Sequence, residues 1–372
     1  MYVHPDVEHA FNNLPREEFF LDQNSPQDYQ SGLRYIDTLE RRRIAALAKP
    51  LWETLPHVLD TKAIWQLSCS NEDDRHPEMA YRFQTFNRNQ LLIAQPDDVS
   101  IILQKSLRAK VDTHSQVYKA VMTVRKSAPR NVCVKIFQQS LCKLPDPEYF
   151  DEDAAWPALW RSARQDAAVE AWAYRKLVSL QGAWIPHSLG FYKIRMPGGE
   201  VAVAHVLEYL DGMVMSNLTG DIVAQRLGPN YGIFDMATVL EERLYHMQSL
   251  GVMHGDLLPR NLMLLRQSPN QDPWSALLIL DFDCARATEC YDSNCDIVHP
   301  LMLLQHLGAS ADVIERWFRQ HASSNPPPKW IPLFGNEKYD DAHFRFWRSN
   351  AHRDEHRRGL REKKDVKRVA DM

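Results

Sequence analysis

The clearest alternation of apolar and polar residues lies between residues 99 and 137. Three runs rich in apolar and β-branched residues follow one another there: VSIILQKSL at 99–107, VYKAVMTV at 117–124 and VCVKIF at 132–137. Polar segments separate them, and RKSAPRN at 125–131 has the composition of a turn. Short β-branched runs with turns between them are typical of consecutive strands. The pattern therefore predicts an antiparallel meander.

A helix and two further strands are expected next. The segment 157–180, PALWRSARQDAAVEAWAYRKLVSL, starts with a proline, and Gly182 follows its end. Because proline suits a first helical turn and glycine the position after the last, these bounds predict a helix that begins at Pro157. The apolar runs at 184–195 and 201–212 predict two more strands.

A second helix is predicted at 235–250, where six apolar residues recur at helical spacing and share one face. They are Met236, Val239, Leu240, Leu244, Met247 and Leu250. Packing against a core explains this face fully, and the helix leads directly into a polar loop that begins at His254.

The segment after this helix predicts a hairpin with polar residues gathered at one end. Two short apolar runs, 261–265 and 276–280, are separated by residues typical of turns. The hairpin would bring Asp256, Asn261 and Asp281 together. Two carboxylates and an amide suit a magnesium–phosphate site, because hard cations take oxygen ligands.

Composition narrows the class of protein. The chain has 372 residues, 44% of them apolar, which suffices for one large domain or two modest ones. A net charge of -4 and a pI near 6.4 argue against a protein whose whole surface binds nucleic acid. No apolar run reaches membrane-spanning length, and the acidic, mixed N-terminus is unlike a signal or transit peptide. We therefore expect an intracellular protein, cytoplasmic or nuclear, with no membrane partner.

The cysteines favour a reducing compartment. The six cysteines lack C-x-x-C spacing and lie mostly in apolar runs. Inert core thiols are therefore expected rather than a metal site.

Four motifs together resemble the protein-kinase-like superfamily. His254-x-Asp256 with Asn261, followed by an apolar strand and Asp281-Phe282, is similar to the catalytic loop and metal-binding turn of that superfamily. Lys135 ends the run VCVK, which resembles the V-A-I-K of the third kinase strand, and Glu170 resembles the helix glutamate that pairs with it. The resemblance implies an α+β, two-lobed fold, with an antiparallel β-sheet N-lobe and a shortened, mostly helical C-lobe.

The same resemblance implies a role for each site residue. Asp256 would accept or orient the proton of the attacking hydroxyl, and Lys135 would hold the phosphates of ATP with Glu170 fixing it. Asn261 and Asp281 would hold Mg²⁺, and His254 would pack beneath the loop. Contacts to adenine are implied for the side chains of Val117, Cys133 and Met263 and the backbone of Glu208 and Leu210, with Leu207 as the gatekeeper.

Several positions depart from the pattern. The three positions of the phosphate-binding glycines hold Lys110, Asp112 and Ser115, which weakens or rearranges the grip on phosphate, although Lys110 could partly compensate. Gly255 stands where protein kinases usually have arginine, and His-Gly-Asp resembles aminoglycoside- and choline-kinase-like phosphotransferases and fungal-type kinase-like proteins. Leu258 replaces a lysine, with Arg260 nearby.

These residues predict an ATP- and Mg²⁺-dependent phosphotransferase acting on a hydroxyl, expected to be a protein serine or threonine. A small-molecule phosphotransferase is the alternative. It is favoured by the short C-lobe and by Asp283, which replaces the glycine of D-F-G. The missing glycines and Leu258 favour a second alternative, a pseudokinase that acts as a binding scaffold. No motif identifies the acceptor.

The predicted segments are a helical extension at 1–95, an N-lobe at 96–210, a C-lobe at 211–325 and a charged tail at 326–372. Within the extension, 27–48 has helical spacing and 79–95 could add strands to a sheet edge. Helices are expected at 296–308 and 313–321. The tail's basic texture suits either a solvated helix or a patch for import or an acidic partner.

Overall fold

The computed structural model describes residues 29–65, 99–124, 128–144, 161–227, 232–265, 277–287 and 298–321. Its contacts divide the chain into two units, residues 1–309 and residues 310–372. Helix α8 (Ala311–His321) belongs to the second unit, whereas the C-lobe was predicted to extend to residue 325. The tail at 326–372 and the strands predicted at 79–95 lie outside the described residues.

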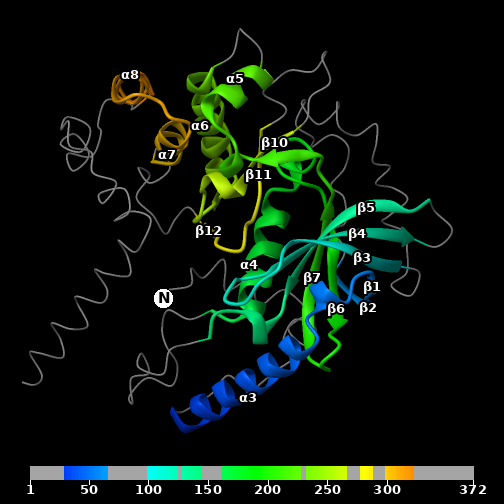
Figure 1. The fold of residues 1–372 in the computed structure, drawn as a ribbon. Helices are drawn as coiled ribbons and strands as arrows, with labels where there is room; N and C mark the ends of the chain where they lie inside the picture. The colour runs from blue at the N-terminus through cyan, green and yellow to red at the C-terminus, as the bar shows by residue number, and fades with distance from the viewer. Residues whose placement is uncertain are drawn as a thin grey trace, which may run out of the picture. The chain divides into compact units, whose positions relative to one another are not determined.

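A seven-stranded antiparallel sheet forms the first lobe (Figure 1). Its middle is the predicted meander, β3 (Val99–Arg108), β4 (Gln116–Val124) and β5 (Arg130–Phe137). The two further predicted strands, β6 (Ser188–Arg195) and β7 (Val201–Glu208), are also present, and β7 pairs with β5. These five strands confirm the reading of the apolar runs.

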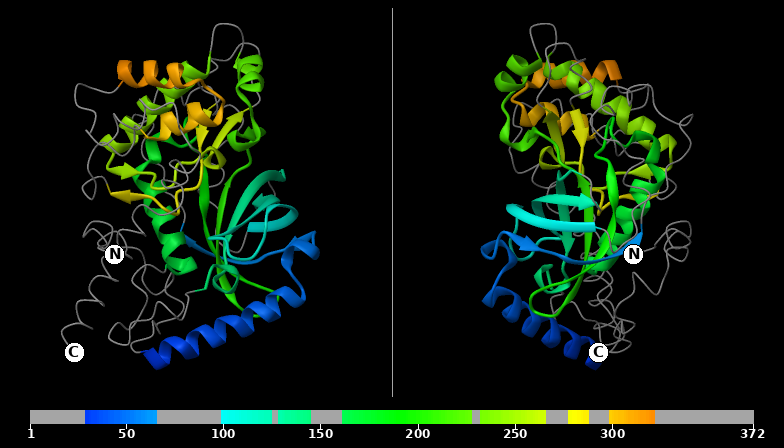
Figure 2. Two further views of the ribbon diagram at one scale, coloured as in Figure 1. Left: turned by 60° about the vertical axis from the view of Figure 1, so that its left-hand side comes forward. Right: turned by 90° about the vertical axis from the view of Figure 1, so that its right-hand side faces the viewer.

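The two outermost strands correct the predicted extension. β1 (His57–Val58) pairs with β3, and β2 (Asp60–Trp65) pairs with β6 at the opposite end of the sheet. Residues 57–65 therefore belong to the sheet lobe, not to a helical extension. The preceding helix α3 (Tyr29–Ala48) matches the helix expected at 27–48, and a short 3₁₀ turn, η1 (Leu51–Glu53), follows it. Figure 2 shows α3 beside the sheet lobe in both views.

The two faces of the sheet carry different kinds of residues. Since side chains alternate along a strand, every second residue of β4 and β5 enters one apolar core. These buried residues include Tyr118, Ala120, Met122, Val132, Val134 and Ile136. The opposite face carries a row of residues paired directly across neighbouring strands. The row consists of Arg108, Val117, Lys135, His205 and Phe191.

Helix α4 (Ala163–Lys176) packs near this second face, against β5 and β7. It begins later than predicted, because Ser162 and Gln165 form a capping box and residues 161 and 162 are not helical. A capping box satisfies two backbone groups at a helix start and fixes the first turn at Ser162. Pro157 lies outside the described residues. A 3₁₀ turn, η9 (Val178–Leu180), follows, and Gly182 adopts a φ of +80°.

The second lobe is mostly helical. It contains α5 (Gly220–Leu227), α6 (Ile233–Ser249) and α7 (Val298–His306), and α6 confirms the helix predicted at 235–250. β10 (Leu262–Leu265) and β11 (Leu277–Ile279) form the predicted hairpin, which β8 (Gly212–Val214) extends. The remaining short elements are β9 (Val252–Met253), β12 (Arg286–Ala287), η10 (Met215–Asn217) and η11 (Pro259–Asn261).

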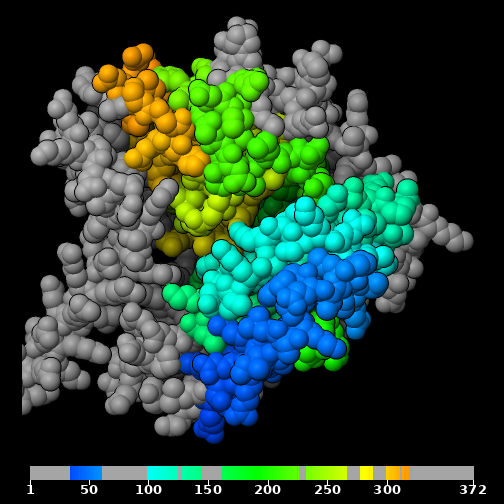
Figure 3. Space-filling view, in the orientation of Figure 1, coloured from blue at the N-terminus to red at the C-terminus, as the bar shows by residue number. Residues whose placement is uncertain are grey.

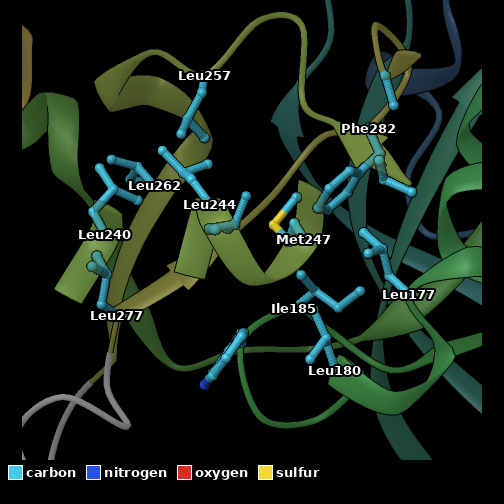
Figure 4. Close-up of a cluster of buried hydrophobic side chains, with 14 of the residues drawn as sticks. Leu177, Leu180, Ile185, Leu240, Leu244, Met247, Leu257, Leu262, Leu277 and Phe282 are labelled. Carbon is cyan, nitrogen blue, oxygen red and sulfur yellow. The ribbon is translucent and has the colours of Figure 1, made fainter. Parts of the chain in front are cut away.

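One apolar core connects the end of α4 with the helical lobe (Figure 4). Leu177 and Leu180 lie on one side of it, Leu240 and Leu244 of α6 on the other, and Phe282 is fully buried beside them. The two lobes meet along an oblique boundary in the space-filling view (Figure 3). This core therefore positions the segment that contains Asp281 relative to the helix that contains Glu170.

The architecture confirms the predicted two-lobed α+β fold, with an antiparallel sheet lobe and a mostly helical lobe. Among the described helices, none combines the length and apolar character needed to cross a bilayer.

Candidate functional site

The ammonium group of Lys135 is the centre of the candidate site. It donates hydrogen bonds to Glu170 of α4, to Asp281, and to Asp283 at 3.1 Å. Lys135 is only 4% exposed. Burial opposes its charge, but the three carboxylates outweigh burial and raise the pKa of Lys135 well above its usual value. The predicted Lys135–Glu170 ion pair is present, and Asp281 joins it.

The three carboxylates respond differently to the same cation. Burial opposes ionisation of Glu170 and Asp281, yet Lys135 lowers the pKa of both, and Arg108 lowers that of Asp281 further. Burial instead raises the pKa of Asp283 to about 6, and the neighbouring charges of Asp281 and Glu170 add to the rise against the opposing effect of Lys135. Asp283 is therefore the carboxyl of this group that takes a proton most readily.

The same three carboxylates are candidate ligands for a divalent cation. One oxygen from each of Glu170, Asp281 and Asp283 lies within 4.8 Å of the others. Oxygen donors of this kind suit Mg²⁺, which prefers carboxylates, water and phosphate oxygens. The predicted metal residue Asp281 belongs to this group. Asp283, which sequence reasoning treated only as a departure from D-F-G, also belongs to it.

The turn that presents Asp281 is held by both lobes. Asp281 adopts a φ of +69°, which is uncommon for a residue with a side chain and places local strain in the turn. The amide of Leu280 donates to the carbonyl of Asn261 at 2.8 Å, and Phe282 packs edge-on against Tyr174 of α4. These contacts fix the direction in which the Asp281 carboxylate points.

His254 supports the loop that precedes Asp256, as predicted. It is 1% exposed and donates from Nε2 to the carbonyl of Leu280 at 2.8 Å, while its Nδ1 accepts from the amide of Asp256 at 3.3 Å. Burial lowers the pKa of His254, which agrees with a neutral ring. The loop and the Asp281 turn are thus joined through one imidazole.

The structure explains why glycine occupies position 255. Gly255 has a φ of +76°, and a Cβ atom there would lie 2.1 Å from the carbonyl oxygen of Cys284. Because that oxygen belongs to the backbone, a side chain cannot fit without moving the Asp281 turn. The arginine that protein kinases usually carry at this position is therefore excluded by packing.

Asp256 is the accessible carboxylate of the site. Its side chain is 32% exposed and accepts a hydrogen bond from Arg260 at 2.8 Å. Nδ2 of Asn261 donates to the Asp256 carbonyl at 2.7 Å and to its carboxylate at 3.2 Å. The structure therefore places Asn261 against Asp256, and the metal-binding role of Asn261 stays a prediction.

The residues predicted to surround adenine are each partly accessible. Val117, Cys133, Met263, Glu208 and Leu210 are all half-buried. Cys133 pairs directly with Leu207 across β5 and β7, whereas the register places Met263 opposite Val214 and Leu278. The amide of Glu208 donates to the carbonyl of His187 at 2.9 Å. Their contact with adenine stays a prediction.

A buried chain of hydrogen bonds, which was not predicted from the sequence, supports Glu170. His205 of β7 contacts Glu170 Oε1 through Nδ1 at 2.5 Å and Ser188 Oγ through Nε2 at 2.8 Å. Burial lowers the pKa of His205, so the neutral ring donates from Nδ1 to the carboxylate and accepts from the serine hydroxyl. His205 pairs with Lys135 across the strands, so the alternation of β7 was the available signal.

The cysteines within the described residues are free thiols: Cys133, Cys142 and Cys284. Burial raises the pKa of both Cys133 and Cys284 to about 12, which keeps these thiols protonated and unreactive. This agrees with the expectation of inert thiols.

Comparison with known proteins finds similarity to solved structures but none to curated sequences. No family model and no curated protein matches the sequence. Similar solved structures include WaaP in complex with acyl carrier protein, which is 17% identical with a TM-score of 0.38 over 66% of this chain and 86% of that one. Another is the kinase domain of Mycobacterium tuberculosis PknI, 15% identical with a TM-score of 0.33 over 56% and 73% of the two chains.

Proposed function

We propose that the protein is an ATP- and Mg²⁺-dependent phosphotransferase that moves the γ-phosphoryl group of ATP to a hydroxyl, with a protein serine or threonine as the expected acceptor. The observation that carries this proposal is the contact of Lys135 with both Glu170 and Asp281, which lie 35 and 146 positions away in the sequence. Phosphoryl transfer depends mainly on positioning and on neutralising charge, and this contact assembles the groups that do both.

Each residue has a defined task in this proposal. Lys135 holds the phosphates while Glu170 and His205 fix its position. Asp281 and Asp283, with Asn261 as predicted from the resemblance, provide oxygen ligands for Mg²⁺, which neutralises charge on the phosphates when bound. Asp256 accepts or orients the proton of the acceptor hydroxyl, since it is the carboxylate that remains open to solvent.

The test is turnover of MgATP by the purified chain with protein and small-hydroxyl acceptors. Asp256→Asn should lower the rate by about 10²–10⁴-fold, because a positioned base contributes that much. Asp281→Asn should also abolish most turnover. The matched control is Asp221→Asn on the exposed start of α5, which should leave the rate unchanged. Full activity in both site variants would refute the assigned roles.

A binding scaffold is the second candidate, and one observation favours it. The candidate base and the candidate metal ligand each already have an arginine partner, Asp256 with Arg260 and Asp281 with Arg108. A scaffold would bind MgATP with no turnover on any acceptor, and Asp256→Asn would then leave nucleotide affinity unchanged.

Turnover with protein acceptors and with small hydroxyl compounds distinguishes a protein kinase from a small-molecule phosphotransferase. Asp283 in place of glycine supports a small-molecule acceptor, because it adds a buried carboxylate beside the candidate metal ligands. Phosphorylation of small hydroxyl compounds and not of proteins would favour this alternative over a protein kinase.

A further inference from the structure

The loop 109–115 occupies the position of the phosphate-binding glycines, but two of its backbone amides are already engaged. The amide of Lys110 donates to Oε1 of Gln116 at 2.9 Å, and the amide of Asp112 donates to the carbonyl of Leu141 at 2.9 Å. A glycine-rich loop binds phosphate through free amides that approach closely. At two of the three glycine positions this loop has no free amide to offer.

The loop is also held from outside by side chains of two helices. Arg43 of α3 pairs with Asp112 at 3.1 Å, and His114 contacts Asp166 in the first turn of α4 at 2.8 Å. Asp166 is 1% exposed. Turning the amides of Lys110 and Asp112 toward a ligand would break these contacts, which favours a side chain as the phosphate-binding group.

Arg108 is the cation that faces the candidate metal site from this side. It lies at the end of β3, in the cross-strand row with Val117 and Lys135, just after an irregularity in the pairing with β4. An irregularity of this kind redirects a side chain. Nη1 lies 3.2 Å from Oδ2 of Asp281, whose Oδ1 accepts from Lys135, and Nη2 donates to Ser115 Oγ at 3.1 Å.

One donor of Arg108 has no acceptor among the described residues. Its Nε–H is buried without a hydrogen-bond partner in the described part of the chain. A buried donor without a partner is costly, and a ligand oxygen would remove that cost. The guanidinium therefore has spare hydrogen-bonding capacity next to the carboxylate that is predicted to hold Mg²⁺.

We propose that Arg108 is a phosphate-binding residue whose side chain takes over the task of the missing glycine-rich loop, with the terminal phosphates of a nucleoside triphosphate as its ligand. The inference rests on the proposed function. A planar guanidinium matches phosphate oxygens with two parallel hydrogen bonds. The Arg108 side chain is 36% exposed, so it can exchange its bond to Asp281 for one to a ligand. A divalent cation on Asp281 would repel the guanidinium toward the phosphates.

The experiment measures binding of MgATP, MgADP, AMP, adenosine and inorganic tripolyphosphate by calorimetry to the full chain and to Arg108→Gln. We expect MgATP affinity to fall about tenfold or more, since charge-assisted hydrogen bonds are lost. The loss should shrink with each phosphate removed and vanish for adenosine. Arg108→Lys should restore part of the affinity. Lys105→Gln, on the same strand and exposed, controls for net charge and should change affinity less than threefold.

The outcomes separate the inference from the proposed function. Wild-type protein that binds neither MgATP nor tripolyphosphate overturns both. Wild-type protein that binds MgATP with an affinity unaffected by Arg108→Gln overturns the role of Arg108 alone, as does an equal loss for adenosine and ATP. If the wild type instead binds tripolyphosphate but not MgATP, and Arg108→Gln loses that binding, the result supports the contact of Arg108 with phosphate and overturns the nucleoside triphosphate as its ligand. Urea unfolding of each variant shows that the fold is intact.

Discussion

The candidate site has two halves that use the same chemistry at different depths. In the sealed pocket, formed by Lys135, Glu170 and His205 with the Asp281 turn, the side chains of Lys135 and Glu170 are 5% and 1% exposed. In the open loop around Asp256, the paired side chains of Asp256 and Arg260 are 32% and 54% exposed. Each half contains a cation on a carboxylate, so the difference between them is access of water.

Water access decides what each ion pair contributes. A cation that has lost its hydration depends on its partners, and removing one side of a buried pair typically costs about 3–5 kcal/mol. An exposed pair is screened and contributes about 0–1 kcal/mol. Any change to an ion pair in the sealed pocket therefore destabilises the protein strongly, which keeps its geometry fixed. In the open loop, Asp256 can exchange Arg260 for another partner at little cost in free energy.

The largest effect is expected in the sealed pocket. Lys135→Met should lower the free energy of unfolding by about 3–5 kcal/mol, because it leaves the carboxylates of Glu170, Asp281 and Asp283 buried together without their shared cation. Urea unfolding measures the change. Lys105→Met, at an exposed position on β3, is the matched control and should change it by less than about 0.5 kcal/mol. Equal stability of the two variants would show that the pocket is not sealed.

A middle-sized effect is expected at His205, and it depends on pH. Burial holds the folded pKa of His205 below the ordinary value near 6.5, so the unfolded chain takes up this proton first as the pH falls. The wild type should therefore lose stability as the pH falls below about 6.5, and His205→Gln should lose less over the same range. Urea unfolding at pH 8 and pH 5 gives the two losses. Equal losses would mean that His205 does not titrate as a buried neutral ring.

The smallest effect is expected in the open loop. Arg260→Gln should change the free energy of unfolding by less than about 1 kcal/mol, since its pair with Asp256 is exposed. High salt should change this difference in unfolding free energy between the variant and the wild type by only a small amount. A loss above about 2 kcal/mol would contradict the comparison, because it would give Arg260 the energetic weight of a buried cation.

Much of the fold was predictable because it depends on local patterns. The strands at 99–137, the strands at 188–208, the helix at 233–249 and the hairpin that ends at Asp281 all follow from alternation or from helical spacing. The start of α4 was not, since it is fixed by the hydrogen bonds of the capping box between Ser162 and Gln165, which were not predicted from the sequence. The strands at 57–65 were also missed, because two- and six-residue strands at the ends of a sheet have little periodicity of their own.

The sequence by itself determined the residue types and order of the candidate site: a lysine on a strand, a glutamate on the next helix, and two carboxylates around a hairpin. The tertiary structure decided which further residues join them. Arg108 and His205 reach the site through strand register, and Gly255 is required by the backbone of Cys284. Register and close backbone approach depend on partners distant in the sequence, so a local pattern cannot contain them.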